Sequence, residues 1–359
     1  MKRSFAAYLT CALLAFAPPA VSAEESVSVM TRNLYLGADL APILSAPTPG
    51  AFGQAVVAAL TQIAANNFPQ RAASLAREIA DKRPHLVGLQ EVFRLTLNGS
   101  TGAPPYRDYL ADLLDALSEQ GESYYVVARV QNLNVLIPIP GLGLVAATDH
   151  DVVLARADVP AWTVPLSGCQ ASFDGCNYDH VVTLNTAVGP ITLERGFVVV
   201  DALVDGAKPV RLANTHLEIP ELPPQFQAAQ ANQLIAHLNG LPDPGGPTIV
   251  VGDINSAPTD QTITIGGLAV VPPYAQLAAV YRDAWLLRPG RPAGFTCCEL
   301  SNLSNPESML FKRVDVVFTT DVPARVKANV LGVDQEDKTP LGLWPSDHAG
   351  VLAELQFRY

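Results

Sequence analysis

Short runs of apolar, β-branched residues alternate along the chain with segments that have a helical period. The runs predict strands at 27–33, 86–90, 152–154, 197–204, 210–215, 248–252, 314–318 and 349–355. Several are continuous Val/Ile/Leu runs, which is typical of strands buried on both faces. The pattern predicts an α/β fold with sheets inside and helices outside.

Three segments have the features of amphipathic helices. The first two carry apolar residues at i, i+3, i+4 and i+7: Ala72, Leu75, Ala76 and Ile79, then Leu110, Leu113, Leu114 and Leu117. The third covers 225–238 and follows two prolines, which favour a helix start. We expect these helices to cover the sheets.

Two long segments show no such period. Residues 38–70 carry Pro, Gly and Ala, so we expect irregular structure there. Residues 132–147 are apolar but broken by two prolines and two glycines, which argues against a helix or a simple core strand. Two interpretations stay open for 132–147: a loop packed on the body of the protein, or an exposed apolar loop that makes peripheral contact with lipid or an apolar substrate.

Polar residues stand at the ends of most of the predicted strands. They are Asn33, Glu91, His216, Asp253, Asn255, Asp315, Asp347 and His348. In α/β folds, side chains at strand ends converge on one crevice, where ligands bind. Each of these residues alone could serve a turn or a cap, as we expect for Asp283, but the whole set predicts one site.

The residue types at these positions point to metal-assisted phosphoester chemistry. Glu91, Asp253 and Asp347 are hard oxygen donors, which suit Mg²⁺, with Mn²⁺ or Ca²⁺ as alternatives, and do not suit zinc. The chain has no HExxH, GxSxG or GxxxxGK[ST] motif, so zinc-protease, serine-hydrolase and P-loop functions lack their signatures. Carboxylates and two histidines around a cation fit attack of water on a phosphoester.

The ordered motifs resemble those of the endonuclease/exonuclease/phosphatase superfamily, which includes deoxyribonucleases, abasic-site endonucleases, bacterial sphingomyelinases and inositol polyphosphate phosphatases. The motifs are N33, LQE91, NTH216, GD253xN255, RVD315 and SD347H348, and the resemblance runs from about residue 27 to the C-terminus. It implies a four-layer α/β sandwich, with two facing mixed β-sheets flanked by helices, in a single catalytic domain over 24–359.

On the metal side, the resemblance implies that Glu91 is the main ligand. Asn33 would lie beside it, and Asp347 would support the same ion. Some relatives carry an acidic residue two places after the first Asn, but here that position is Tyr35, and Asp39 lies further on. The number of metal ions therefore stays open.

On the phosphate side, the resemblance implies that Asp253 positions or deprotonates the attacking water. Asn255 would hold that water or the phosphate. His348 would hydrogen-bond the scissile phosphate while Asp315 orients its ring, and His216 would also contact the phosphate.

The first residues have the features of a secretory signal peptide. Lys2 and Arg3 precede an apolar stretch at 6–17, and Val21-Ser22-Ala23 is a small-x-small cleavage signal. Cleavage near Ala23 predicts a secreted or periplasmic protein. It would change the net charge from −11 to −13, because the leader holds two basic and no acidic residues. So acidic a protein has no general attraction to polyanions, although bound cations can reverse this locally.

Four cysteines follow the predicted leader: Cys169, Cys176, Cys297 and Cys298. An even number in an exported chain predicts disulfides, and three pairings are open. Cys169 and Cys176 flank a short loop and could pair locally. A four-cysteine metal site is the alternative.

Three functions follow from these observations. The first is a nuclease-like, metal-dependent phosphodiesterase. The second is a sphingomyelinase- or phospholipase-C-like enzyme, which the negative charge and the apolar 132–147 segment favour. The third is a non-catalytic binding protein on the same fold. The expected partner is therefore a phosphodiester, either nucleic acid or phospholipid head group, and no motif indicates an obligate protein partner.

Overall fold

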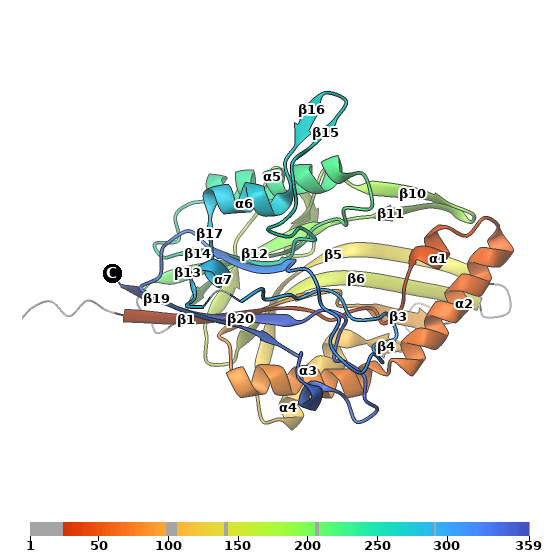
Figure 1. The fold of residues 1–359 in the computed structure, drawn as a ribbon, viewed down its shortest axis with the longest axis horizontal. Coiled ribbons are helices and arrows are strands. Elements are labelled where there is room, and N and C mark those ends of the chain that lie inside the picture. The colour runs from red at the N-terminus through yellow and green to blue at the C-terminus, as the bar shows by residue number, and fades with distance from the viewer. Residues whose placement is uncertain (1–23, 98–105, 140–142, 205–207, 291, 359) are drawn as a thin grey trace, which may run out of the picture.

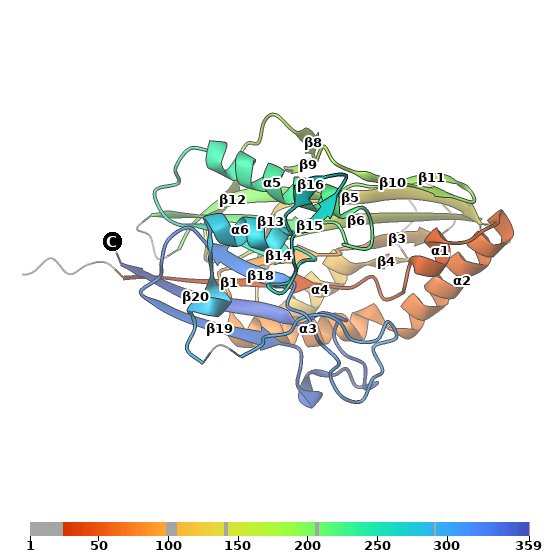
Figure 2. The ribbon, with the colours of Figure 1, turned by 45° about the horizontal axis from the view of Figure 1, so that its top comes forward.

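Two large β-sheets face each other, and helices cover their outer faces (Figures 1 and 2). The computed structural model describes residues 24–97, 106–139, 143–204, 208–290 and 292–358. The predicted signal peptide, 1–23, lies outside the described residues. The predicted four-layer α/β sandwich is confirmed.

The first sheet joins the two ends of the described chain. Its path is β19 (Arg325–Leu331), β20 (Gly350–Arg358), β1 (Glu24–Asn33), β2 (Leu86–Gln90), β6 (Gly143–Arg156), β3 (Arg94–Leu97) and β4 (Arg107–Asp108), with β5 (Tyr124–Ile139) along β6. β1 is parallel to β2 and antiparallel to β20, so the sheet is mixed.

The second sheet is built from the middle of the chain and is also mixed. Its path is β17 (Arg282–Asp283), β18 (Asp315–Thr319), β14 (Thr248–Asp253), β13 (Pro209–His216), β12 (Gly196–Leu203), β9 (Gly175–Asn177) and β8 (Gln170–Ser172), with β7 (Ala161–Thr163) on β12. β13 is parallel to β14, whereas β14 is antiparallel to β18. Two hairpins stand apart, β10–β11 (Val182–Thr186, Gly189–Leu193) and β15–β16 (Ile263–Ile265, Leu268–Val270).

Valines and leucines from both sheets fill the space between them, as the unbroken apolar runs predict. α3 (Phe68–Lys82) and α4 (Tyr109–Glu119) pack on the outer face of the first sheet. α5 (Pro224–Gly240) and α6 (Pro273–Val280) pack on the second. The three predicted helices are thus confirmed as α3, α4 and α5. Among the described residues, no helix is long and apolar enough to cross a membrane.

The prediction of irregular structure over 38–70 is wrong. This segment holds α1 (Ala41–Leu44), α2 (Pro49–Ala65) and the start of α3. Thr48 caps α2 by accepting a hydrogen bond from Ala51 N at 3.2 Å, and Pro49 suits the first turn. The buried side of α2 carries Phe52, Val56, Ala59 and Ile63, a helical period that small residues between them conceal.

The 132–147 segment is not a loop of either predicted kind, because it belongs to the long β5–β6 hairpin. Residues 140–142, between β5 and β6 in the sequence, lie outside the described residues. Pro138 is tolerated because it lies on β5, which pairs with β6 on one side only in this part of the chain. Leu136 faces outward and is 60% exposed, whereas its neighbours Val135 and Ile137 face inward.

The cysteines form two separate pairs, Cys169–Cys176 and Cys297–Cys298. The first pair links the residue before β8 to β9, and the second joins neighbours in the long segment between α7 (Ala284–Leu287) and β18. The four thiols therefore do not form one shared metal site.

A buried amide connects the two sheets. Asn214 Nδ2 on β13 donates to the carbonyls of Leu89 at 3.0 Å and Val152 at 3.1 Å in the first sheet. Gln90 Nε2 donates back to Asn214 Oδ1 at 2.7 Å. Gly88 makes room for this contact, because a Cβ there would lie 2.6 Å from Asn214 Oδ1. Glu91 follows Gln90 and His216 lies two residues after Asn214, so this bridge aligns the sheets directly beneath the site.

We expect Asn214→Ala to lower the free energy of unfolding by roughly 2–4 kcal/mol, because two carbonyls and one amide lose their buried partner. Asn185→Ala on the exposed side of β10 is the matched control and should change stability by less than about 0.5 kcal/mol. Urea unfolding of both variants measures the difference, and equal midpoints would contradict a structural role for the bridge.

Candidate active site

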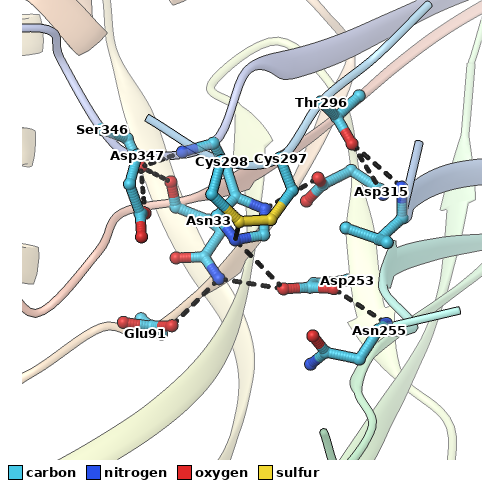
Figure 3. The surroundings of a disulfide bond; sticks show 12 residues. Asn33, Glu91, Asp253, Asn255, Thr296, Cys297, Cys298, Asp315, Ser346 and Asp347 are labelled. Atoms are coloured by element: carbon cyan, nitrogen blue, oxygen red, sulfur yellow. Dashed lines mark hydrogen bonds and ion pairs between the residues drawn. A yellow bond between two sulfur atoms is a disulfide. The ribbon is translucent and has the colours of Figure 1, made fainter. Parts of the chain in front are cut away.

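The eight predicted site residues converge at the ends of five strands and in the loop between β19 and β20. Strand register explains the convergence. Parallel pairing places Asn33 opposite Gln90, next to Glu91, and His216 opposite Asp253. Antiparallel pairing places Asp315 opposite Asp253. The long loop that carries Asp347 and His348 then brings them to the same place, as Figure 3 shows for the labelled Asp347.

Asn33 holds two acidic groups together. Its Nδ2 donates to Glu91 Oε1 at 3.1 Å and to Asp253 Oδ2 at 3.2 Å, so it lies between them (Figure 3). Its Oδ1 accepts a hydrogen bond from Tyr35 N at 2.9 Å. Glu91 Oε2 accepts one from Leu36 N at 2.8 Å. Both oxygens of Glu91 therefore have a fixed position.

Three non-glycine residues here have left-handed backbone conformations. They are Tyr35 (φ 59°), Glu91 (φ 54°) and Asn255 (φ 49°). Such conformations are uncommon outside glycine and persist where surrounding contacts enforce them, often at functional sites. Here they turn the chain sharply after a strand and direct polar groups into one space.

The carboxylates of Glu91 and Asp347 fit a hard divalent cation. Both line the same cavity. Burial raises the pKa of Asp347 to about 7, and the negative charges of Glu91 and Asp253 add to this rise. A divalent cation bound between such oxygens would remove the repulsion and the cost of burying the charge.

Asp253 is held on both sides. Asn255 N donates to its Oδ1 at 2.9 Å, and Asn33 Nδ2 donates to its Oδ2. Burial nevertheless raises the pKa of Asp253 to about 6, because the positive charge of His348 offsets burial only in part and Asp315 adds repulsion. A carboxylate with a pKa near neutrality is suited to accept a proton.

His348 is held as a cation. Its Nδ1 lies 2.9 Å from Asp315 Oδ2, and its Nε2 lies 3.7 Å from Asp253 Oδ2. Burial alone would lower the pKa of His348, but the carboxylates of Asp315 and Asp253 raise it well above the ordinary value. His348, Asp253 and Asp315 place ligand atoms within 4.8 Å of one another. A protonated ring cannot coordinate a metal, so this group is better suited to donating hydrogen bonds.

Two neighbouring residues, Thr296 and Cys298, contact Asp315 and His348. Thr296 Oγ1 accepts hydrogen bonds from the main-chain N–H groups of Val314 and Asp315, at 3.0 and 3.1 Å. Cys298 Sγ lies 3.8 Å from His348 Nε2, so the Cys297–Cys298 disulfide, labelled in Figure 3, lies next to this ring nitrogen. These contacts leave the His348 ring few orientations in which it can donate a hydrogen bond to a ligand.

His216 is the neutral counterpart of His348. Burial lowers its pKa well below the ordinary value, and the positive charges of Arg195 and His348 add to the effect. Arg195 donates to His216 Nδ1 at 3.1 Å, while His216 Nε2 lies 3.5 Å from Asp253 Oδ2. Asn255 Nδ2 lies 3.2 Å from the same ring nitrogen.

The sequence pattern described as the Endonuclease/Exonuclease/phosphatase family matches residues 62–348, which is most of the chain. The chain belongs to this family. The endonuclease/exonuclease/phosphatase family consists of phosphoester hydrolases that generally use divalent metal ions. The resemblance inferred from the motifs is therefore confirmed.

Solved structures share the family fold. An endonuclease/exonuclease/phosphatase family protein from Bacteroides thetaiotaomicron has a TM-score of 0.55 at 17% identity, covering 94% of this chain and 96% of its own. A mannosyl-6-phosphatase of the same organism has a TM-score of 0.54 at 18% identity, covering 92% and 99%. A family protein from Beutenbergia cavernae has a TM-score of 0.54 at 21% identity, covering 93% and 72%. No curated protein matches the sequence. At these identities the likeness concerns the fold alone.

Some polar groups of this family site did not stand out in the sequence. Arg195 comes just before β12 and donates to Glu218 at 3.1 Å, but neither belongs to a motif. Asp149 and Asp151 lie two residues apart on β6, and both are buried. Burial raises the pKa of Asp151 to about 7. Charged residues at a period of two inside an apolar run are the signal that could have identified them.

The structure also places two acidic residues outside the main set. Asp283 is structural, as predicted, because it accepts a hydrogen bond from the Tyr274 hydroxyl at 2.6 Å and pairs with Arg313 at 2.8 Å. Asp39 is exposed and accepts a hydrogen bond from Ala41 N at 2.9 Å. It lines the same cavity as Glu91, at the start of α1.

The raised carboxylate pKa values predict how stability depends on pH. In the unfolded chain Asp has a pKa of about 4. Asp253 and Asp347 titrate at about 6 and 7 in the fold. Between these limits the folded state binds more protons, so the metal-free protein should become less stable as pH rises from about 4 to 7. Calorimetry in EDTA should show the melting temperature falling over this range.

Mg²⁺ should reverse the trend, because it binds the ionised carboxylates. The increase in melting temperature on adding Mg²⁺ should be larger at pH 8 than at pH 5. An equal increase at both values would mean that the ion binds elsewhere. An Asp347→Asn variant provides the control, since it removes a charge that the ion would neutralise and should lose most of the effect.

Proposed function

We propose that this protein is an exported, divalent-metal-dependent hydrolase of a phosphodiester. The observation that supports it most is the convergence of three kinds of group at one set of strand ends: the carboxylates Glu91 and Asp347, which line one cavity, a buried carboxylate of raised pKa at Asp253, and an imidazole of raised pKa at His348. They supply, in that order, cation binding, proton acceptance and stabilisation of negative charge.

Glu91 and Asp347 would hold Mg²⁺, with Mn²⁺ or Ca²⁺ as alternatives, and Asn33 keeps Glu91 in place. When bound, the ion neutralises charge on the phosphate oxygens and so lowers the barrier to attack. Hard oxygen ligands and a site open to a cavity agree with an ion that retains waters and contacts substrate.

Asp253 would take a proton from the attacking water, which adds to phosphorus in line with the departing ester oxygen. Asn33 and Asn255 hold the two carboxylate oxygens of Asp253 in place, so Asp253 presents a single orientation to the attacking water. His348 would donate a hydrogen bond to a phosphate oxygen as charge develops, and Asp315 keeps the ring charged and oriented. His216, held by Arg195, would contact the phosphate from the second sheet.

Hydrolysis of bis-p-nitrophenyl phosphate, plasmid DNA and sphingomyelin should require Mg²⁺ and cease in EDTA. We expect His348→Ala to lower kcat by about 100-fold or more, as for loss of a donor that stabilises transition-state charge. His237→Ala on α5 is the matched control, because His237 hydrogen-bonds Gln233 O of its own helix at 2.9 Å, contacts the ring of Phe197 on β12 and is not one of the proposed catalytic residues.

Equal rates in His348→Ala and His237→Ala would contradict the assigned role of His348. Absence of turnover for every diester with every cation would contradict the proposed function and favour a binding protein. The three substrates also separate nuclease activity from lipid phosphodiesterase activity.

Export is part of the proposal, and residues 1–23 support it by their sequence. Expression in a bacterial host with an intact secretion system should yield a protein that begins at Glu24 outside the cytoplasm. N-terminal sequencing of the periplasmic and medium fractions measures this. A protein recovered in the cytoplasm with Met1 still attached would contradict export.

A further inference from the structure

A cavity of about 510 Å³ opens directly from the candidate site. Glu91, Asp347, Arg195 and Glu218 contribute to its wall, but most of the wall is aliphatic. The aliphatic part includes Val56 and Leu60 of α2, Ile137 of β5, Val145 of β6 and Ile191 of β11. A volume of this size is typical of sites for small organic ligands.

The polarity of the wall changes along one face of β6. Asp149 lies in the wall close to Glu91, and the next residues on the same face, Ala147 and Val145, are apolar. At the rise of a β-strand, Asp149 and Val145 are about 13 Å apart. The cavity therefore runs from charged groups at the strand ends to an apolar far end beside Val145.

The far end is closed by packing. Phe52 and Val56 of α2 form one buried cluster with Ile139 and Val145 of the β5–β6 hairpin. β11 lies against β5 on the other side. Figure 1 shows both hairpins running past the central strands beside α1 and α2. The cavity is thus enclosed by α2, β11 and the paired strands β5 and β6.

The geometry points to an amphiphilic substrate: a phosphodiester with one alkyl or acyl chain, whose phosphate lies at Glu91 and Asp347 and whose chain fills the aliphatic cavity. This inference rests on the proposed phosphodiesterase function and names its substrate class. An aliphatic cavity offers no hydrogen-bond partners, so it favours a group that needs none.

The same wall argues against a nucleic acid in this cavity. Single-stranded nucleic acids bind through basic grooves and stacked aromatic rings. Among the described residues that line the cavity, Arg195 is the only arginine or lysine, and Glu218 already pairs with it at 3.1 Å. The chain also carries a net charge of −11. A polyanion with polar sugars would meet a mostly aliphatic wall whose charged groups are mainly carboxylates.

A series of p-nitrophenyl alkyl phosphodiesters tests the inference. Methyl, butyl and octyl esters share one reacting phosphorus. Water adds to it, the P–O bond to nitrophenolate breaks, nitrophenolate leaves with the electron pair, and the alkyl phosphate and a proton remain. With Mg²⁺ and esters kept monomeric, we expect KM to fall by up to fourfold for each added methylene (about 0.8 kcal/mol), while kcat stays constant.

Two neighbouring alanines supply a matched pair of variants. Ala147 lines the cavity, whereas Ala146 lies on the opposite face of β6, opposite the outward-facing Leu136. Ala147→Phe should raise KM for the octyl ester at least tenfold and leave the methyl ester within twofold. Ala146→Phe should leave both values unchanged.

Wild-type protein gives a second measurement that does not depend on variants folding. 1-Octanol should raise KM for the octyl ester and leave KM for the methyl ester unchanged, because it competes for the cavity and not for the phosphate. Comparing a monomeric dodecyl ester with the same ester in phosphatidylcholine vesicles shows whether the chain is taken from solution or from a bilayer.

The outcomes separate this inference from the function on which it rests. Metal-dependent hydrolysis with the same KM for all chain lengths would overturn the apolar-chain inference and leave the phosphodiesterase in place. A higher kcat/KM for an oligonucleotide than for the octyl ester would do the same. No turnover of any ester with any cation would overturn both.

Discussion

The buried amide of Asn214 is the contact on which the site depends most. The site takes Glu91 and the loop bearing Asp347 and His348 from the first sheet, and His216, Asp253 and Asp315 from the second, so its geometry requires a defined alignment of the two sheets. Apolar packing alone is tolerant of small shifts, because valine and leucine surfaces can slide past one another. An amide with fixed donors and acceptors is not tolerant, since a shift leaves buried groups without partners. The hydrogen bonds of Asn214 and Gln90 thus fix one alignment of the two sheets across an otherwise apolar interface, and Gln90 directly precedes Glu91.

Above this bridge, buried arginines secure the loops that carry the acids. Arg71 of α3 donates to Leu34 O at 2.7 Å and to Pro345 O at 3.0 Å, which joins the turn after β1 to the loop that holds Asp347. Arg32 pairs with Glu78 at 3.0 Å and also donates to the carbonyl of His348. Both guanidinium groups are fully buried and bind mainly main-chain or helix partners. They place positive charge behind the acids without occupying the space in front, which keeps that space open to a cation and a phosphate.

The sequence predicted the fold and the convergence of the eight polar residues, because both depend on local signals. Apolar runs define strands, and polar residues at strand ends converge in any sandwich of this kind. Arg195 and Asp149 were not predicted as site residues, because their contacts depend on which strands become neighbours in the fold. The segment 38–70 was misjudged since alanine and glycine hide the apolar side of α2. The 132–147 hairpin was misjudged because prolines on an edge strand resemble those of a loop. Both errors concern elements that wall the cavity, so the feature that bears on substrate choice was the least visible in the sequence.

The position of β20 sets the order in which the protein can fold. This last strand lies between β19 and β1, the first strand, and residues 24 and 358 are paired across the sheet. The first sheet, and with it the loop bearing Asp347 and His348, therefore remains incomplete until almost the whole chain is available. Pairings between such distant residues form slowly, because closing a large loop costs entropy before the new contacts can stabilise the chain. A chain still being synthesised would thus lack the complete candidate site until its last strand is available.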